Sequence, residues 1–187
     1  MSDALAAIVL AGGRAARLGG IDKPALELDG VSLMTRAVTA ARGGGAQQVV
    51  VVGPERSRLD AVFVREEPAF GGPVAAIAAA LPRIDGDLVL VLAADLRRPV
   101  EVVAALQAAT ADRDGCLLTD AGGQPQWLCG LYRVPALRAA LRALGDPAGA
   151  SMRDLLGGLR LARHPVTTEI VADVDTPADA REAGLEL

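Results

Sequence analysis

The stretch D-L-V-L-V-L-A-A-D, from Asp87 to Asp95, decides the fold class of this chain. Its centre is a nearly continuous apolar run with valine at every second position, and it is too short for a typical helix. An alternating pattern would leave one face in water, whereas a continuous apolar run predicts a strand buried on both faces. Such strands are typical of parallel sheets covered by helices, so the sequence predicts an α/β architecture.

Similar signals recur on both sides of this stretch. Short apolar runs predict further strands at Ala6–Leu10, Gln48–Val52 and Ala61–Val64. Amphipathic or alanine-rich stretches predict helices at Ser32–Arg42, Gly72–Leu81 and Val100–Ala109, with Ser32 and Pro99 as starting signals. After residue 110 we expect strands at Cys116–Thr119 and Gln126–Tyr132, helices at Pro135–Leu144 and Met152–Leu156, a last strand at Thr168–Val171, and a terminal helix capped by Thr176. Strands that alternate with helices indicate a doubly wound, mostly parallel sheet.

Composition places the chain among compact globular proteins. Its 187 residues fit one domain, which we expect to span residues 1–187. Hydrophobic residues make up 51% of the chain and charged residues 22%, which excludes an intrinsically disordered protein. The net charge is −4 and the pI is about 5.0, so the basic excess of nucleic-acid-binding proteins is missing. We expect no nucleic-acid partner, and local cations must hold any anionic ligand.

The sequence favours a cytoplasmic protein with no membrane segment. No basic residues precede the first apolar run, and no apolar run approaches the roughly 20 residues that cross a bilayer. Cys116 and Cys129 lack the spacing of a metal site or a disulfide framework, so we expect two buried thiols. His164 has no metal-type partner in the sequence and is interpreted as structural. The expected state is a monomer or a weak homo-oligomer.

A glycine-rich basic loop follows the first predicted strand and reads L-A-G-G-R-A-A-R-L-G-G-I-D-K. Adjacent glycines let a ligand approach the backbone, and successive free N–H groups can cradle phosphate oxygens. Lys23 is the only lysine among 19 basic residues, and a compact ammonium is not replaced by a planar guanidinium. The spacing matches neither a P-loop nor G-x-G-x-x-G. The loop predicts a different polyphosphate site, with a flexible turn as the alternative, and its candidate residues are Gly12, Gly13, Arg14, Arg17 and Lys23.

Two acidic positions are candidates for a metal site. Asp95 stands at the carboxyl end of the buried strand, where ligands of open α/β sheets bind. A carboxylate there suits Mg²⁺, which takes one or two carboxylates and completes its shell with phosphates and water. The D-V-D-T-P turn adds Asp173 and Asp175, one of which is expected to complete the site. Helix capping is the alternative role for each of these aspartates.

A third loop, R-E-E-P-A-F-G-G-P-V-A-A, runs from Arg65 to Ala76. The G-G-P sequence predicts the start of a helix whose N-terminus faces the ligand. Glu66 and Glu67 are candidates to accept hydrogen bonds from a base or a sugar, and a solvated turn is the alternative.

Together these motifs resemble the nucleotidyltransferases of the molybdenum cofactor guanylyltransferase (MobA) type. The resemblance rests on L-A-G-G-x-x-x-R-x-G-G-x-D-K, the later G-G-P, and Asp95 at the end of the buried strand, and it extends from Leu10 to the closing D-V-D-T-P. It implies a Rossmann-like three-layer fold. It also implies Mg²⁺-dependent transfer of GMP from GTP to the phosphate of molybdopterin, with release of pyrophosphate.

The resemblance also assigns roles to particular positions. It implies nucleotide contacts at Leu10, Ala11, Gly12, Gly13, Arg14, Lys23, Gly53 and Glu66, catalytic roles for Arg17, Lys23 and Asp95, and metal binding at Asp95 and Asp175. Glu66 stands where the family usually has Asp, and Gly53 where the guanylyltransferases tend to have Asn. The closing D-V-D-T-P is closer to the molybdopterin cytidylyltransferases. CTP as the substrate, another phosphorylated acceptor, and a nucleotide-binding homologue without turnover therefore remain alternatives.

Overall fold

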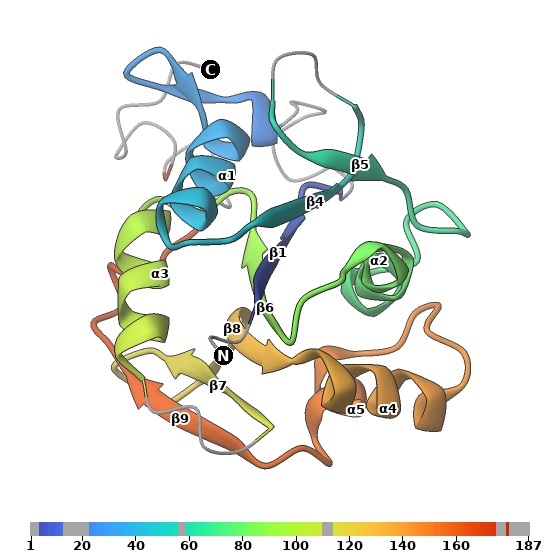
Figure 1. Ribbon diagram of the computed structural model, residues 1–187. Helices are drawn as coiled ribbons and strands as arrows, with labels where there is room; N and C mark the ends of the chain where they lie inside the picture. The colour runs from blue at the N-terminus through green and yellow to red at the C-terminus, as the bar shows by residue number, and fades with distance from the viewer. Residues whose placement is uncertain (1–3, 13–22, 56–58, 110–113, 175–178, 180–187) are drawn as a thin grey trace.

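Figure 1 shows the computed structural model of the chain, which describes residues 4–12, 23–55, 59–109, 114–174 and 179. A central sheet is built from β1 (Leu5–Leu10), β4 (Gln48–Val52), β5 (Val62–Val64), β6 (Leu88–Ala93), β7 (Gly115–Thr119), β8 (Pro125–Arg133) and β9 (Leu161–Pro165). The strand order is β5-β4-β1-β6-β8-β7-β9. The predicted mostly parallel α/β sheet is confirmed, because β8 alone among these strands runs antiparallel to its neighbours.

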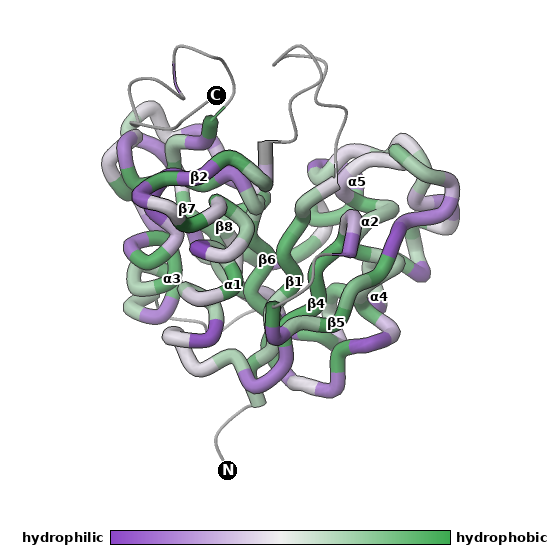
Figure 2. The backbone as a smooth tube through the Cα atoms, turned by 90° about the horizontal axis from the view of Figure 1, so that it is seen from above, coloured by the Kyte–Doolittle hydropathy of each residue, from purple (hydrophilic) through white to green (hydrophobic). Residues whose placement is uncertain are grey.

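Helices cover both faces of the sheet. On one face lie α1 (Leu33–Gly43) and α3 (Pro99–Ala108), and on the other lie α2 (Pro73–Ala80), α4 (Val134–Leu144) and α5 (Met152–Leu156). Each face buries its own apolar cluster, so the central strands are covered twice. Figure 2 shows the result as a hydrophobic centre formed by β1, β4 and β6, with hydrophilic segments concentrated toward the outside.

The predicted helix starts are confirmed in detail. Ser32 is the N-cap of α1, and its hydroxyl accepts a hydrogen bond from the Thr35 N–H at 3.2 Å. Pro73 and Pro99 occupy the first turns of α2 and α3, where the missing N–H of proline costs no helical hydrogen bond. These residues set where each of the three helices begins.

One strand prediction is wrong, and two features have no counterpart in the prediction. Residues 168–171 form turns, and the last strand is β9, earlier in the chain, where it pairs in parallel with β7. β9 reads Leu-Ala-Arg-His-Pro, which has neither a continuous apolar run nor a regular alternation, so its pairing comes from tertiary contacts. The unpredicted features are a hairpin of β2 (Glu27–Leu28) with β3 (Val31–Ser32), and two short 3₁₀ helices, η2 (Lys23–Ala25) and η3 (Leu81–Arg83). The terminal helix predicted after Thr176 lies almost wholly outside the described residues.

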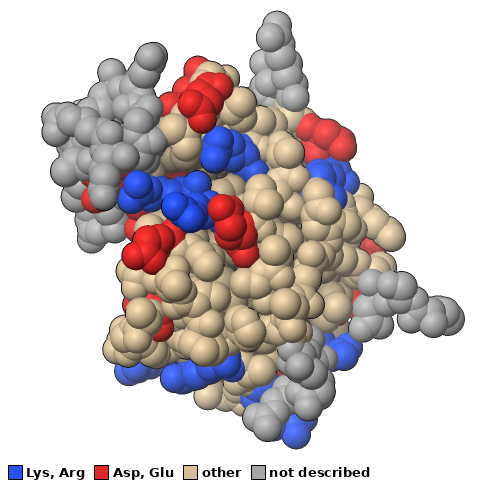
Figure 3. Space-filling view, turned by 90° about the vertical axis from the view of Figure 1, so that its left-hand side faces the viewer, with Lys and Arg blue, Asp and Glu red and all other residues tan. Residues whose placement is uncertain are grey.

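Two further properties concern the surface and the thiols. Within the described ranges, no helix has both the length and the apolar character needed to cross a membrane. The face of the molecule in Figure 3 carries acidic and basic side chains side by side, so charges of both signs alternate there. Cys116 and Cys129 are buried free thiols, as predicted.

Candidate nucleotide and metal site

The carboxyl ends of four parallel strands are joined by backbone hydrogen bonds that continue past the strands. The Ala11 N–H donates to the Val52 C=O at 2.9 Å, and the Ala94 N–H donates to the Leu10 C=O at 3.0 Å. The Gly53 N–H donates to the Val64 C=O at 3.0 Å. Loops that are far apart in the sequence therefore start from one rigid edge, which is where an open α/β sheet binds its ligands.

Gly12 and Glu66 meet at this edge. A Cβ atom placed on Gly12 would lie 3.4 Å from Oε1 and 3.6 Å from Oε2 of Glu66. The position of the Glu66 carboxylate is also fixed within its own loop, because its Oε1 accepts a hydrogen bond from the Phe70 N–H at 3.2 Å. The backbone at Gly12 and the Glu66 carboxylate are therefore close neighbours, and a side chain at position 12 would lie against this carboxylate.

Gly53 explains a departure from the family pattern. A Cβ atom there would lie 3.1 Å from both the carbonyl carbon and the oxygen of Ala11. This spacing is tighter than ordinary van der Waals contact, so an asparagine at this position would require a shift of the backbone after β1. In this chain the absent side chain allows the loops after β1 and β4 to pack directly on each other.

The loop between β5 and α2 turns sharply before the helix. Gly72 has φ +90°, a left-handed conformation that suits glycine, and it serves as the N-cap of α2. The Gly71 C=O accepts a hydrogen bond from the Gly149 N–H at 2.8 Å, which ties this loop to the segment before α5. The N-terminus of α2 thus starts at the same sheet edge as Glu66, as the G-G-P sequence predicts.

Asp95 follows β6 and is partly buried at the same edge. Its segment pairs with the residues before the closing turn: the Arg97 N–H donates to the Ala172 C=O at 3.0 Å, and the Val174 N–H donates to the Asp95 C=O at 3.1 Å. Leu96 and Asp173 form a bridge between the two segments. The N-cap of α3 is Arg98, so Asp95 does not occupy the N-cap position of that helix.

Asp95 and Asp173 both lie within electrostatic range of the Cys129 thiol. Burial raises the pKa of this thiol to about 12, and the charges of Asp173 and Asp95 contribute to the same shift. Two carboxylates that are distant in the sequence therefore both contribute to the raised pKa of one buried thiol. The thiol stays protonated at neutral pH, which makes it a poor metal ligand beside two carboxylates.

Several predicted residues cannot be placed. Outside the described residues lie Gly13, Arg14, Arg17 and Asp175. Lys23 opens η2, but its side chain is not described. The structure brings together the carboxyl ends of β1, β4 and β5, with that of β6 adjacent. The predicted residues at these ends are Leu10, Ala11, Gly12, Gly53, Glu66 and Asp95. Sequence reasoning did not identify Phe70, whose role depends on a backbone N–H.

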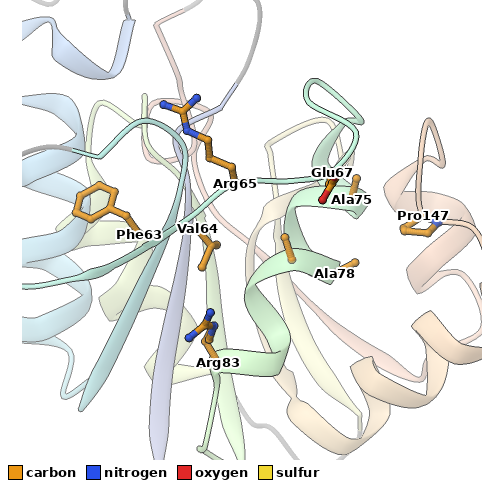
Figure 4. A pocket seen from close by; sticks show the side chains of 9 residues that line it. Phe63, Val64, Arg65, Glu67, Ala75, Ala78, Arg83 and Pro147 are labelled. Carbon is orange, nitrogen blue, oxygen red and sulfur yellow. The ribbon is translucent and has the colours of Figure 1, made fainter.

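A separate groove of about 480 Å³ lies between β5 and α2. Figure 4 shows Arg83 rising into it from below, Ala78 on its helix side, and Glu67 beside Ala75 at the upper end. The Arg65 side chain lines the groove but extends away from α2. Glu66, Gly12 and Asp95 do not line this groove, so the residues that carry the nucleotide motifs form a different site at the strand ends.

Comparison with known sequences identifies one family. Residues 7–166 match the family described as the MobA-like NTP transferase domain. A probable molybdenum cofactor guanylyltransferase of Synechococcus elongatus is 35% identical over 93% of this chain and 95% of its own length. The molybdenum cofactor guanylyltransferase of Shewanella amazonensis is 30% identical over 76% of each chain.

A solved structure agrees in fold. The nucleotidyl transferase of Methanothermobacter thermautotroptrophicus superposes with a TM-score of 0.74, covering 96% of this chain and 95% of that one at 23% identity. The matched region of the family includes all four loops described above, from the end of β1 to the segment after β6.

Proposed function

The chain belongs to the MobA-like NTP transferase family and is a nucleotidyltransferase, and from this premise we propose that it transfers GMP from GTP to a molybdopterin-type phosphate, releasing pyrophosphate. The observation that carries the proposal is the 35% identity to a probable molybdenum cofactor guanylyltransferase, which spans 93% of this chain. Both buried cysteines are free thiols, which supports a reducing, cytoplasmic setting for the reaction.

We assign the nucleotide to the edge formed by β1, β4 and β5. Glu66 is fixed by the Phe70 N–H and faces Gly12, so its carboxylate is preorganised to accept hydrogen bonds from N–H groups of a base. The edge of guanine presents adjacent N–H donors, which suit a carboxylate. The bare backbone at Ala11 and Gly12 suits the sugar and phosphates, and Lys23 is assigned to the phosphates.

The residues after β6 fit a divalent cation. Asp95 and Asp173 come from two segments joined by backbone hydrogen bonds, and both carboxylates act on Cys129. Mg²⁺ needs only one or two carboxylates, because substrate phosphates and water complete its shell. The described residues contain no group of three or more acidic, histidine or cysteine side chains that could hold a metal. Asp95 with Asp173 or Asp175 would hold the ion.

The reaction requires little from acid–base groups. An oxygen of the acceptor phosphate attacks the α-phosphorus of GTP, a new P–O–P bond forms, and the bond to the β-phosphate oxygen breaks so that pyrophosphate leaves. No proton must be removed, because the attacking phosphate is already an anion. Bound Mg²⁺ supplies neutralisation of charge on the phosphates. Lys23 adds a fixed positive charge, and the sheet edge holds donor and acceptor in line.

A binding and turnover assay tests the choice of base. The chain is titrated with GTP and with CTP, each with Mg²⁺, and pyrophosphate release is followed after addition of molybdopterin. We expect tighter binding of GTP and release of pyrophosphate only when the acceptor is present. A clear preference for CTP would overturn the guanylyl assignment, and binding of GTP without any release would favour a nucleotide-binding homologue that lacks turnover.

A further inference from the structure

The order of strands indicates which part of the sheet edge is left to an acceptor. Gly12, Gly53 and Glu66 follow β1, β4 and β5, and Asp95 follows β6. With the nucleotide assigned to the edge of β5, β4 and β1, the remaining part of this edge lies beyond β6. The next elements at this edge are the start of β8 and the end of β7.

The sheet is interrupted at this place. Leu117 and Leu118 are consecutive residues of β7, but they pair with Gly130 and Gln126 of β8, so residues 127–129 form a bulge. The ladder between β6 and β8 ends at the Leu92–Cys129 pair. Trp127 therefore falls outside both ladders. Bulges are common beside active sites, where they redirect a side chain out of the strand pattern.

The backbone of this bulge is held from the core. The hydroxyl of the fully buried Tyr132 donates to the Trp127 C=O at 2.9 Å. Trp127 itself is partly buried and packs against the apolar cluster beneath α2, α4 and α5, while part of the side chain stays exposed. An indole in this state presents surface to a ligand without being free to reorient.

A hairpin holds the other end of the bulge. Asp120 accepts backbone hydrogen bonds from Gly122 and Gln124, both at 2.9 Å, and its Oδ2 accepts from Nε2 of Gln126 at 3.2 Å. Since Nε2 points to Asp120, Oε1 of Gln126 is directed to the other side. Trp127 is thus placed between a fixed amide and Cys129, the residue that lies near the charges of Asp95 and Asp173.

From this geometry, and resting on the proposed function, we propose that Trp127 determines acceptor specificity by stacking its indole on the planar heteroaromatic ring of a phosphorylated pterin. The acceptor phosphate then reaches past β8 toward Asp95, and the Gln126 amide lies beside the ring edge. A sugar or polyol phosphate offers no planar aromatic ring and gains less from stacking on Trp127. Stacking on an aromatic side chain is worth about 10- to 100-fold in affinity, which is enough to separate these classes of acceptor.

Fluorescence of the wild-type chain gives a direct test without turnover, because Trp127 is the only tryptophan. The probes are 6-hydroxymethylpterin phosphate and, as a phosphate monoester without an aromatic ring, ribose 5-phosphate, with N-acetyltryptophanamide as the correction for absorbed light. We expect saturable quenching by the pterin phosphate and none by ribose 5-phosphate. Equal responses to both probes, or a response that does not saturate, would overturn the proposal.

Substitutions separate stacking from packing. Trp127→Leu keeps an apolar side chain and is expected to raise the acceptor KM about 10- to 100-fold, Trp127→Phe only a few-fold, and neither changes the GTP KM. Leu128→Ala, in the same bulge, is the control and should lower thermal stability but leave the acceptor KM unchanged. An unchanged acceptor KM in Trp127→Leu, or a parallel rise of both KM values, would show a merely structural tryptophan.

These measurements distinguish a failure of the Trp127 proposal from a failure of the proposed function. Saturable pterin quenching without any pyrophosphate release would refute the proposed transfer but support the role of Trp127. Normal turnover on molybdopterin in Trp127→Leu would refute the role of Trp127 and leave the transfer intact. If Trp127→Leu fails to fold, as judged by circular dichroism, Trp127→Phe and the fluorescence titration decide the question.

Discussion

The two halves of the sheet follow different rules. The half with β5, β4, β1 and β6 is parallel, and the bonds after the strands join its loops into one edge. The half with β8, β7 and β9 includes the one reversed strand, β8, contains the bulge at residues 127–129, and ends in an edge strand. We assign the first half to the nucleotide, whose phosphates are common to many reactions, and the second to the acceptor. The regular parallel edge suits the nucleotide, which is common to many transferases, and the irregular half suits the acceptor, which differs between them.

Substitution of Asp95 should have the largest effect on transfer, because Asp95 follows β6, the strand that borders both halves of the sheet. Asp95→Asn removes a charged metal ligand and is expected to lower transfer by about 10³-fold, with no Mg²⁺-dependent turnover at low millimolar concentration. Pyrophosphate release during a Mg²⁺ titration measures this. Asp60→Asn is the control, since the Asp60 side chain is 92% exposed in a surface ion pair. A normal Mg²⁺ titration in Asp95→Asn would remove the metal from this position.

Lys23 tests whether the nucleotide half depends on one fixed ammonium. Lys23→Ala is expected to lower transfer about 10²-fold with an unchanged melting temperature, because one preorganised positive charge is lost. Lys23→Arg should remain at least about tenfold below the wild type, since a planar guanidinium differs in shape from an ammonium. Initial rates and thermal melts measure both. Wild-type rates in the Ala variant would contradict a phosphate role for Lys23.

A smaller change sharpens the division between the halves. In Gly12→Ala the new methyl group would lie 3.4 Å from Oε1 of Glu66, which displaces the carboxylate slightly. We expect the GTP KM to rise about tenfold, equal to about 1.4 kcal/mol, and the acceptor KM to stay the same. Gly43→Ala is the matched control, because a Cβ there meets no atom within 4 Å. A rise of the acceptor KM instead would show that the two halves do not divide the substrates in this way.

The smallest expected effect is in the acceptor half. Tyr132→Phe removes the hydrogen bond to the Trp127 C=O, and we expect the free energy of unfolding to fall by about 1 kcal/mol. The acceptor KM should rise a few-fold, because the bulge loses its anchor, and the GTP KM should not change. Urea unfolding and steady-state kinetics measure these values. An altered GTP KM with a constant acceptor KM would reverse the assignment of the two halves.

The sequence alone determined the parallel half and supplied most of the candidate residues at its edge. Continuous apolar runs revealed β1, β4 and β6, since strands buried on both faces have no polar alternation. Glycine and proline marked the starts of α2 and α3, because their effects on the backbone are local. Asp95 was identifiable because it directly follows a strand whose end defines a ligand edge.

Only the tertiary structure decided the other half. β9 is an edge strand whose partner β7 is about 45 residues earlier in the chain, and residues 168–171 have strand-like side chains but form turns. The approach of Asp173 to Asp95, the support of Glu66 by a backbone N–H, and the bulge at Trp127 each depend on segments distant in sequence. Side-chain periodicity records burial along one segment. Which segments meet depends on packing across the whole sheet.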